Sequence, residues 1–196
     1  MESYEIKKLV DKAQKQDRDS FGRLFDEYYK PIFGYVLKRV ANVDLAQDLT
    51  SETFFKALKY LPKFEWRTEN SFANWLFRIA TNEINLHFRK WRNTLSINDE
   101  NLNLPDRIPA PEETLPDYEI IQAQTKLERK ETYIKVQKEM AKLKTEYQTV
   151  LTLKYFEKKK IEEICQILKK PEGTVKSWIH RGMENLRKLL EQNATI

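Results

Sequence analysis

The 196-residue chain is basic, with 35 lysines and arginines against 30 aspartates and glutamates and a formal net charge of +5. A hydrophobic fraction of 40% is enough for helical cores, yet no run of about 18 apolar residues is present to span a membrane. The single cysteine excludes an intramolecular disulfide and a cysteine-clustered zinc site. The N-terminal residues lack the apolar core of a secretion signal, so we expect a cytoplasmic protein.

Charge is unevenly distributed along the chain. Residues 1–92 hold 17 basic and 13 acidic residues, a net of +4, and residues 127–196 hold 16 basic and 10 acidic residues, a net of +6. Residues 93–126 between them hold 2 basic and 7 acidic residues, a net of −5. This distribution predicts two nucleic-acid contacts joined by a segment that avoids phosphate.

The sequence of the N-terminal third of the chain predicts three helices. The first covers Tyr4 to Gln16, and the second begins near Ser20 and contains Pro31, which we expect to kink or split it. Asp44 and Gln47 are spaced as a capping pair for the third helix. That helix, over 45–60, is apolar on more than one side, which predicts a central position.

A loop over 61–70 precedes a fourth predicted helix, over 71–92. Four polar residues of this helix are spaced four, three and four positions apart, so they share one face: Arg78, Asn82, Asn85 and Arg89. Amides and guanidinium groups on one face can bond base edges and phosphates. Nearby aromatic residues suit the stacking of unpaired bases: Phe64, Trp66, Trp75, Phe88 and Trp91. A solvated helix face is the alternative, and for Trp75 we favour a place in the core.

Residues 93–118 carry four of the seven prolines and no helical periodicity, which predicts an extended acidic linker. Helical periodicity returns from Asp117 through Lys142 and again from Thr145 to Phe156. No stretch shows the alternation of a strand. We therefore predict an all-α protein of two small helical domains, residues 1–92 and 127–196, joined by a flexible linker over 93–126.

The last segment, over 161–190, predicts a helix-turn-helix. Apolar residues follow a helical period in both helices, and Pro171 marks the start of the second. The opposite face of the second helix begins with a basic, hydroxyl-rich group: Thr174, Lys176, Ser177, His180 and Arg181. A helix-turn-helix places such a face in the DNA major groove. A helical hairpin with a solvated basic side is the alternative.

The sequence shows no signature of catalysis. Its two histidines lie far apart, no nucleophile is paired with a base, and no spacing suits a metal ion. None of the four glycines forms a phosphate-binding loop. We expect no enzyme activity, no catalytic residue, no metal and no cofactor.

Three stretches, in order, resemble the extracytoplasmic-function (ECF) sigma factors, the minimal two-domain promoter-specificity subunits of bacterial RNA polymerase. Residues 45–54 (LAQDLTSETF) resemble the polymerase-binding helix of sigma region two. Residues 71–82 (SFANWLFRIATN) resemble its promoter-melting helix. Residues 171–177 (PEGTVKS), with Glu163 and Ile164 before them and Arg181 after them, resemble sigma region four.

This resemblance implies roles for individual residues. Asp48, Ser51 and Glu52 would grip a coiled coil on the largest polymerase subunit, although family members usually have glutamine where this chain has Ser51. Asn82 would line the pocket for a flipped base of the −10 element, with the loop over 64–70 as its cover. The exposed residues of the helix-turn-helix would read the −35 element as duplex.

The implied partners are core RNA polymerase, promoter DNA and an anti-sigma factor that holds the protein inactive. The acidic linker would pass through the RNA-exit region of the polymerase. Two other functions remain open from the sequence: a helix-turn-helix regulator with an unrelated sensing domain, and a sigma mimic that titrates an anti-sigma factor. We also expect the free protein to bind promoter DNA weakly, because a flexible linker does not hold its two basic faces in register.

Overall fold

The structure is a computed structural model that describes residues 1–95 and 135–192, with side chains in the first range up to Trp91. Within these ranges the chain is helical and contains no strand, which confirms the prediction of an all-α protein. The predicted linker over 93–126 lies almost wholly outside the described residues. The same holds for most of the helix that the sequence predicts over 117–142.

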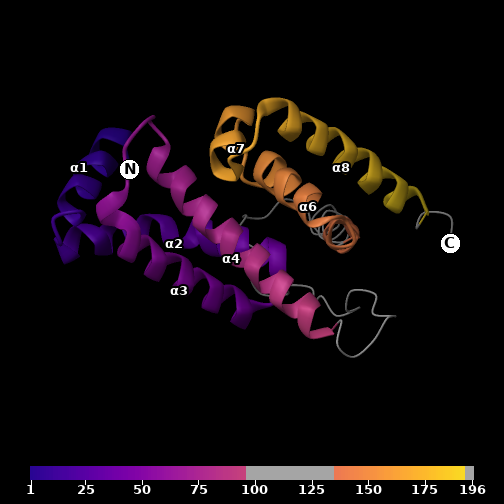
Figure 1. Ribbon diagram of the computed structural model, residues 1–196, viewed down its shortest axis with the longest axis horizontal. Coiled ribbons are helices and arrows are strands. Elements are labelled where there is room, and N and C mark those ends of the chain that lie inside the picture. The colour runs from indigo at the N-terminus through magenta and orange to yellow at the C-terminus, as the bar shows by residue number, and fades with distance from the viewer. Residues whose placement is uncertain (96–134, 193–196) are drawn as a thin grey trace, which may run out of the picture.

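Four long helices and one short turn make up the N-terminal part of the molecule (Figure 1). They are α1 (Ser3–Ala13), α2 (Arg18–Val40), α3 (Val43–Tyr60), the 3₁₀ turn η1 (Leu61–Lys63) and α4 (Ser71–Leu95). Helix α2 packs against α1, α3 and α4, and α3 also packs against α4. The predicted central position of the third helix is therefore confirmed by its two helical neighbours.

The N-terminal core consists of apolar side chains that recur at helical spacing. Ile32, Tyr35 and Val36 of α2 and Leu76 and Ile84 of α4 are fully buried. The hydroxyl of Tyr35 lies 2.8 Å from the Thr81 hydroxyl of α4, so the one polar group of this large side chain is satisfied inside the core. Burial raises the pKa of Tyr35, which keeps this hydroxyl protonated.

Helix α2 continues through Pro31, so the split that the sequence allowed does not occur: Pro31 is exposed, while Leu24 before it and Ile32 after it are buried in the core. The capping prediction for α3 is wrong. The N-cap of α3 is Asn42, whose side-chain oxygen accepts a hydrogen bond from the backbone N–H of Leu45 at 2.8 Å. Asp44, predicted as the cap, lies inside the first turn instead.

The C-terminal part begins with a helical segment over 135–141. It continues with α6 (Thr145–Leu151), the π-helical turn η2 (Thr152–Phe156), α7 (Ile161–Leu168) and α8 (Glu172–Gln192). Helices α7 and α8 form the predicted helix-turn-helix, and Lys169 makes the turn in a left-handed conformation with a φ of 52°.

The core of this part lies between α6, α7 and α8. Val150, Ile164, Ile167 and Val175 are fully buried. Met183 follows the helical period of the apolar residues Val175 and Ile179, which predicts an inward position, but it is 41% exposed. Gly182 takes the inward position beside it, and a Cβ there would lie only 3.2 Å from the Tyr147 Cβ. The absence of a side chain thus allows α8 to lie close to α6.

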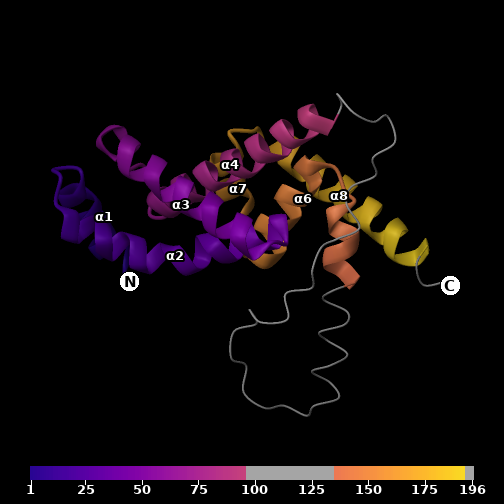
Figure 2. The same cartoon turned by 90° about the horizontal axis from the view of Figure 1, so that it is seen from below.

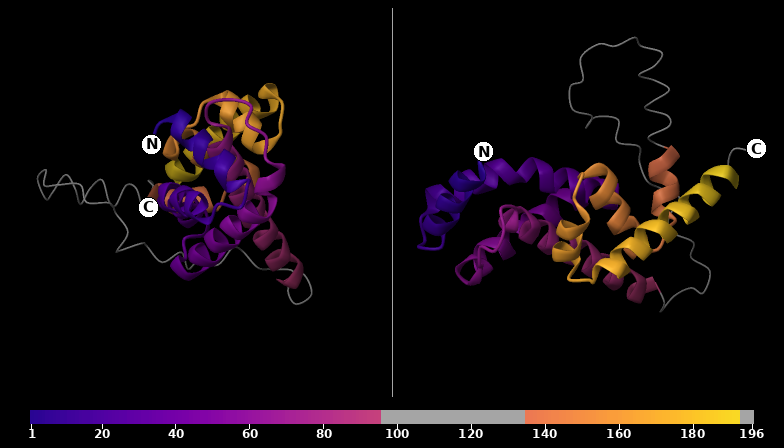
Figure 3. Two further views of the ribbon diagram at one scale, coloured as in Figure 1. Left: turned by 90° about the vertical axis from the view of Figure 1, so that its left-hand side faces the viewer. Right: turned by 90° about the horizontal axis from the view of Figure 1, so that it is seen from above.

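The two parts contact each other directly. Helix α7 packs along α4, and the end of α2 packs against η2. Figures 1 and 2 both show α7 beside α4, and Figure 3 shows α8 extending away from the N-terminal helices. The described residues therefore form one folded body, in which the helix-turn-helix rests on the N-terminal helices.

Candidate functional site

The polar row predicted from the sequence lies on α4. Asn82, Asn85 and Arg89 are exposed, and Arg78 is half-buried. The opposite side of the helix carries Leu76 and Ile84, among others, and is packed into the core. No hydrogen bond within the described part of the chain engages the amides of Asn82 and Asn85. The row is therefore held on a rigid helix with its donors and acceptors available to a ligand.

A second arginine, Arg67, lies near Arg78 at the N-terminal end of this row. Burial lowers the pKa of Arg78, and the neighbouring positive charge of Arg67 lowers it further. Arg67 belongs to the loop before α4, is 79% exposed in its side chain and bonds Glu65 at 3.0 Å. Two guanidinium groups that raise each other's energy are stabilised by an anion such as phosphate. Arg67 was placed in this loop from the sequence but was given no role in DNA binding.

The loop before α4 is held in place by side chains from both of its ends. The Ser71 hydroxyl accepts hydrogen bonds from the backbone N–H groups of Arg67 (3.0 Å) and Thr68 (2.6 Å). Gln14, the residue that follows α1, donates to the carbonyls of Leu61 (3.0 Å) and Phe64 (2.7 Å). These bonds fix the backbone that carries the predicted aromatic residues.

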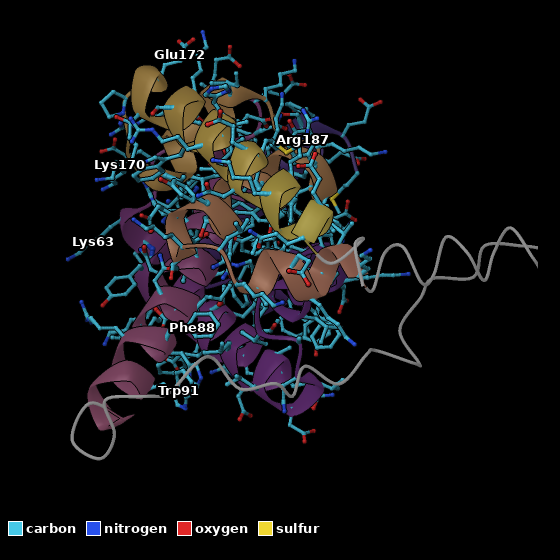
Figure 4. The ribbon with its side chains drawn as sticks, turned by 90° about the vertical axis from the view of Figure 1, so that its right-hand side faces the viewer. Lys63, Phe88, Trp91, Lys170, Glu172 and Arg187 are labelled. Carbon is cyan, nitrogen blue, oxygen red and sulfur yellow. The ribbon has the colours of Figure 1, made fainter. Side chains whose placement is uncertain are left out.

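The aromatic residues of this loop form a cluster with those of α4. The Phe64 ring lies 4.9 Å from the Trp75 ring and 5.6 Å from that of the buried Phe72. Trp66 meets the edge of Phe64 at 6.3 Å. Trp75 is half-buried within this cluster, in agreement with the packing role that we favoured for it. Trp66, at the outer end, has a partly exposed ring, whereas Phe88 and Trp91 lie farther along α4 (Figure 4).

The second predicted face lies on the first three turns of α8. Lys176, His180 and Arg181 are exposed, and Thr174 and Ser177 are partly exposed. Two basic side chains of this face each have a carboxylate one turn away along the helix. Lys176 pairs with Glu172 at 2.6 Å, and His180 Nε2 lies 3.8 Å from Glu184. The bond from Glu172 raises the pKa of Lys176, which therefore stays charged.

The third predicted group lies on α3. Asp48 and Ser51 are exposed, and the side chain of Glu52 is 45% exposed. Lys56 bridges Glu52 (3.3 Å) and the buried Glu83 of α4 (2.6 Å), which fixes this part of α3 to α4. The bond to Glu83 is the main reason that the pKa of Lys56 is raised.

The α3 row continues with an apolar residue that the sequence analysis missed. Phe55 is 63% exposed and lies four positions after Ser51, so it shares the face of the acidic row. Leu58, three positions farther on, is one of the apolar residues that predicted a buried second side for this helix, but it is 51% exposed. An acidic row beside exposed apolar side chains is typical of a protein-binding surface.

Known protein families match both parts of the chain that carry these surfaces. The family described as Sigma-70 region 2 matches residues 24–94, and the family described as Sigma-70, region 4 matches residues 133–186. The ECF RNA polymerase sigma factor SigW of Bacillus subtilis is 34% identical over 190 residues, which cover 94% of this chain and 96% of the relative. The chain belongs to the ECF sigma factors.

Another relative supports this family assignment, and two solved structures share the fold. The RNA polymerase sigma factor YlaC of Bacillus subtilis is 32% identical and covers 87% of this chain and 92% of its own. The fold resembles Bartonella quintana RpoE in complex with the anti-sigma factor NepR (TM-score 0.65, 20% identity, covering 87% and 96% of the two chains). It also resembles CnrH in complex with the cytosolic domain of CnrY (TM-score 0.64, 19% identity, covering 94% and 96%).

The described residues hold neither a membrane-spanning helix nor a cluster of metal ligands. None of the helices in the described ranges is long and apolar enough to cross a membrane. In residues 1–95 and 135–192, no three His, Cys, Asp or Glu side chains come together to hold a metal ion. Cys165, the one thiol, is half-buried on α7, and burial raises its pKa, which lowers its reactivity.

Proposed function

We propose that this sigma factor uses three separate surfaces to start transcription: α3 to bind core RNA polymerase, the α4 row to read and open the −10 element, and α8 to read the −35 element. The observation that carries the proposal is the pair of exposed polar faces on α4 and α8, each borne by a rigid helix of its own packed unit. Sigma factors need no covalent chemistry for this work.

At the −10 element, a base leaves the duplex and enters the space between the α4 row and the loop before it. The exposed amide of Asn82 bonds the edge of the flipped base, and Trp66 and Phe64 offer ring faces for stacking. Asn85 and Arg89 follow the strand along the helix. The converging charges of Arg67 and Arg78 receive a backbone phosphate.

At the −35 element, α8 enters the major groove with its N-terminal turns first. Lys176, His180 and Arg181 face base edges and phosphates, and the hydroxyls of Thr174 and Ser177 add short hydrogen bonds. The left-handed turn at Lys169 sets the angle between α7 and α8, so it determines how deeply α8 reaches into the groove.

Core polymerase binds the acidic row of α3. Asp48, Ser51 and Glu52 supply polar contacts, and Phe55 supplies the apolar anchor that such interfaces commonly have at their centre. Since Ser51 reaches less far than the glutamine usual in the family, Phe55 and the two carboxylates carry most of the binding energy.

The remaining features of the protein follow from this role. Residues 1–92 form the region-two domain, residues 127–196 the region-four domain, and residues 93–126 an acidic linker that passes through the polymerase between the two promoter contacts. The protein acts in the cytoplasm, where polymerase and promoter DNA are found. Because both structural neighbours were solved with anti-sigma factors, an anti-sigma factor is the regulator we infer for this chain.

Reconstituted transcription with core polymerase tests the proposal. Asn82→Ala should reduce open complexes at least tenfold, because the flipped base loses its hydrogen bonds, and Arg181→Ala should lower activity about tenfold only on promoters with a −35 element. The matched controls are Gln192→Ala, which removes an exposed amide, and Arg187→Ala, which removes an exposed charge near the C-terminal end of α8, beyond the turns that carry the predicted row. Activities of both test variants equal to those of their controls would refute the site assignment.

A further inference from the structure

Helix α1 lies outside the parts of the chain that the two sigma families match. The matched ranges are residues 24–94 and 133–186, whereas α1 covers Ser3–Ala13. The helix packs on α2, and its buried face consists of apolar residues: Ile6, Leu9, Val10 and Ala13. Burial of these side chains fixes α1 to the N-terminal core, so a group at either end of α1 has a defined position.

Gln14, the residue that follows α1, bonds the loop over 61–70. The two N–H groups of its side-chain amide are both used there, with the carbonyl oxygens of Leu61 at 3.0 Å and Phe64 at 2.7 Å as acceptors. The backbone N–H of Phe64 donates to the same Leu61 carbonyl at 2.9 Å. Both polar backbone groups of Phe64 are therefore bonded, one of them to a side chain from outside the loop.

The backbone of Gln14 is itself held by α1. Its N–H donates to the Val10 carbonyl at 2.9 Å, and its φ and ψ of −60° and −26° continue the helical conformation. The chain turns away only at Gln16, which has a left-handed φ of 68°. The half-buried amide of Gln14 is therefore carried by the end of a packed helix.

A second bond joins the other end of α1 to the same loop. The Ser3 hydroxyl donates to the backbone carbonyl of Glu69 at 3.1 Å. Helix α1 thus contacts the loop near its start through Gln14 and near its end through Ser3. Because Ser71 ties the loop to α4, the loop is bonded to two helices that are both packed into the core.

The bonded backbone carries the two rings that the proposed function uses for base stacking. The Phe64 ring lies 4.9 Å from that of Trp75 and 6.3 Å from that of Trp66. Since Trp66 follows closely after the carbonyl that Gln14 holds, a shift of this backbone moves both rings. Recognition requires groups held within about 0.5 Å of their productive positions by the residues that support them. Loss of the bonds from Gln14 should therefore weaken stacking without removing a ring.

We propose that α1 fixes the loop over 61–70, and that Gln14 is the positioning residue through which it holds Phe64 and Trp66 in place for the flipped base. Gln14 acts through the Phe64 backbone and does not touch DNA. The bonds between α1 and the loop are observed, whereas their effect on the base rests on the proposed function of the −10 surface. The role belongs to a helix that neither family match includes.

Hydrogen exchange in the free full-length chain tests the support of the loop without DNA. Gln14→Glu keeps the size of the side chain but removes both donated bonds, because a carboxylate cannot donate. Backbone amides of the loop over 61–70 should exchange about fivefold faster, while those of α2 keep their rates. The matched control is Gln16→Glu, which adds the same charge at an exposed position nearby and should leave the exchange of the loop unchanged.

Binding of a −10 single strand to the complex with core polymerase tests the positioning role. Gln14→Glu should weaken binding of the intact strand about fivefold, because the rings no longer meet the flipped base. In a second strand, an abasic site replaces the one base whose removal weakens wild-type binding most. Wild type and Gln14→Glu should bind this second strand equally, since it offers no base for stacking.

Two controls separate positioning from added charge and from lost stability. Gln16→Glu should bind both strands as the wild type does. Leu9→Ala loosens the buried face of α1 but keeps the amide of Gln14, so any weakening that it causes should be equal on the two strands.

Each result that departs from these expectations has a distinct meaning. Unchanged exchange of the loop in Gln14→Glu would overturn its support by α1. Faster exchange with normal binding of the intact strand would overturn the positioning role if Asn82→Ala weakens that binding. Equal weakening on the intact and abasic strands would also overturn it, because Gln14 would then act on the fold alone. If neither Gln14→Glu nor Asn82→Ala weakens binding, the −10 surface is refuted together with the role of Gln14.

Discussion

The two helices that we propose to face DNA in this sigma factor carry different chemistry. On α4, Asn82 and Asn85 offer amides without partners in the described structure, next to a cluster of aromatic rings. On α8, Lys176 and His180 each have a carboxylate one turn away, and the row contains no Phe, Tyr or Trp. One surface is suited to hydrogen bonding and stacking, and the other to balanced charge.

This difference matches the two forms of DNA that the surfaces would meet. An unpaired base exposes its ring faces and its pairing edge, which amides and aromatic rings recognise. A duplex presents phosphates on both sides of a groove, so cations bind it strongly and without selectivity. Glu172 and Glu184 would moderate that attraction. Their carboxylates repel phosphate wherever the DNA base pairs in the groove do not match the side chains of α8. The following predictions test this division of roles.

The largest effect should come from the aromatic cluster of the −10 surface. Trp75→Ala removes a ring that packs on Phe64 and Phe72, so it should lower the free energy of unfolding by about 3 kcal/mol. Trp66→Ala, at the outer end of the cluster, should cost about 1 kcal/mol or less. Denaturant unfolding followed by circular dichroism measures both.

The same pair of variants separates packing from base stacking. With core polymerase present, Trp66→Ala should weaken binding of a single-stranded −10 oligonucleotide about tenfold, since one stacked base contributes about 1–3 kcal/mol. Binding of a −35 duplex should stay unchanged. A Trp66→Ala variant that unfolds as easily as Trp75→Ala, yet binds the oligonucleotide normally, would assign both rings to the core.

Helical periodicity predicted the fold well where one face of a helix is buried. The all-α class, the central third helix and the helix-turn-helix all follow from that signal, because burial of an apolar stripe determines each of them. Errors occur where tertiary packing overrides local preference. Pro31 lies within an unbroken α2, and Met183 points outward because Gly182 takes the close approach to α6.

The candidate surfaces were predicted as rows on single helices, and each row lies on the expected helix with exposed members. The sequence did not reveal groups that meet across elements. The charge of Arg67, in the loop that Ser71 holds, acts on Arg78 of α4, and the buried Arg39 of α2 donates to Thr149 of α6. Such contacts depend on how helices pack, which a helical period does not encode.

A second effect concerns phosphate binding at the −10 surface. Arg78→Ala should weaken binding of the −10 single strand about fivefold and reduce the slope of log affinity against log salt by about 0.7, as expected for one lost phosphate contact on a single strand. Arg78→Lys keeps the charge and should retain the slope. Filter binding of the polymerase complex at several salt concentrations measures both quantities. An Arg78→Ala variant with an unchanged slope would place no phosphate at this arginine.

A smaller and opposite effect is expected on the −35 surface. Glu172→Gln releases Lys176 from its ion pair, so duplex binding should become about threefold tighter and the salt slope steeper by about 0.9. Selectivity for the −35 sequence should fall at the same time, because the added contact is to phosphate. Glu191→Gln, which removes the carboxylate beside Arg187 near the end of α8, is the control. Weaker binding by Glu172→Gln would instead make Glu172 a base-reading residue.

The smallest effect concerns pH and the contact between the two surfaces. Lys159 lies 4.6 Å from the Phe77 ring of α4, and burial lowers its pKa from 10.5, with Glu163 and Glu157 opposing the shift. Below the lowered pKa, Lys159 is charged in the folded and in the unfolded chain, and the folded chain bears the cost of burying the charge. As pH rises from the lowered pKa toward 10.5, the folded chain loses the proton first and gains stability relative to the unfolded chain.

Denaturant unfolding at several pH values measures this dependence. Between pH 7 and pH 9.5, the free energy of unfolding of the wild type, relative to that of Lys159→Arg, should rise by a fraction of the roughly 1.4 kcal/mol that one pKa unit represents. Lys159→Arg remains charged throughout this range, so the comparison removes the contributions that other groups share. A difference that stays constant or falls with pH would show that folding does not desolvate Lys159. The contact between α4 and the helix-turn-helix would then be looser in solution than the packing of Lys159 on Phe77 requires.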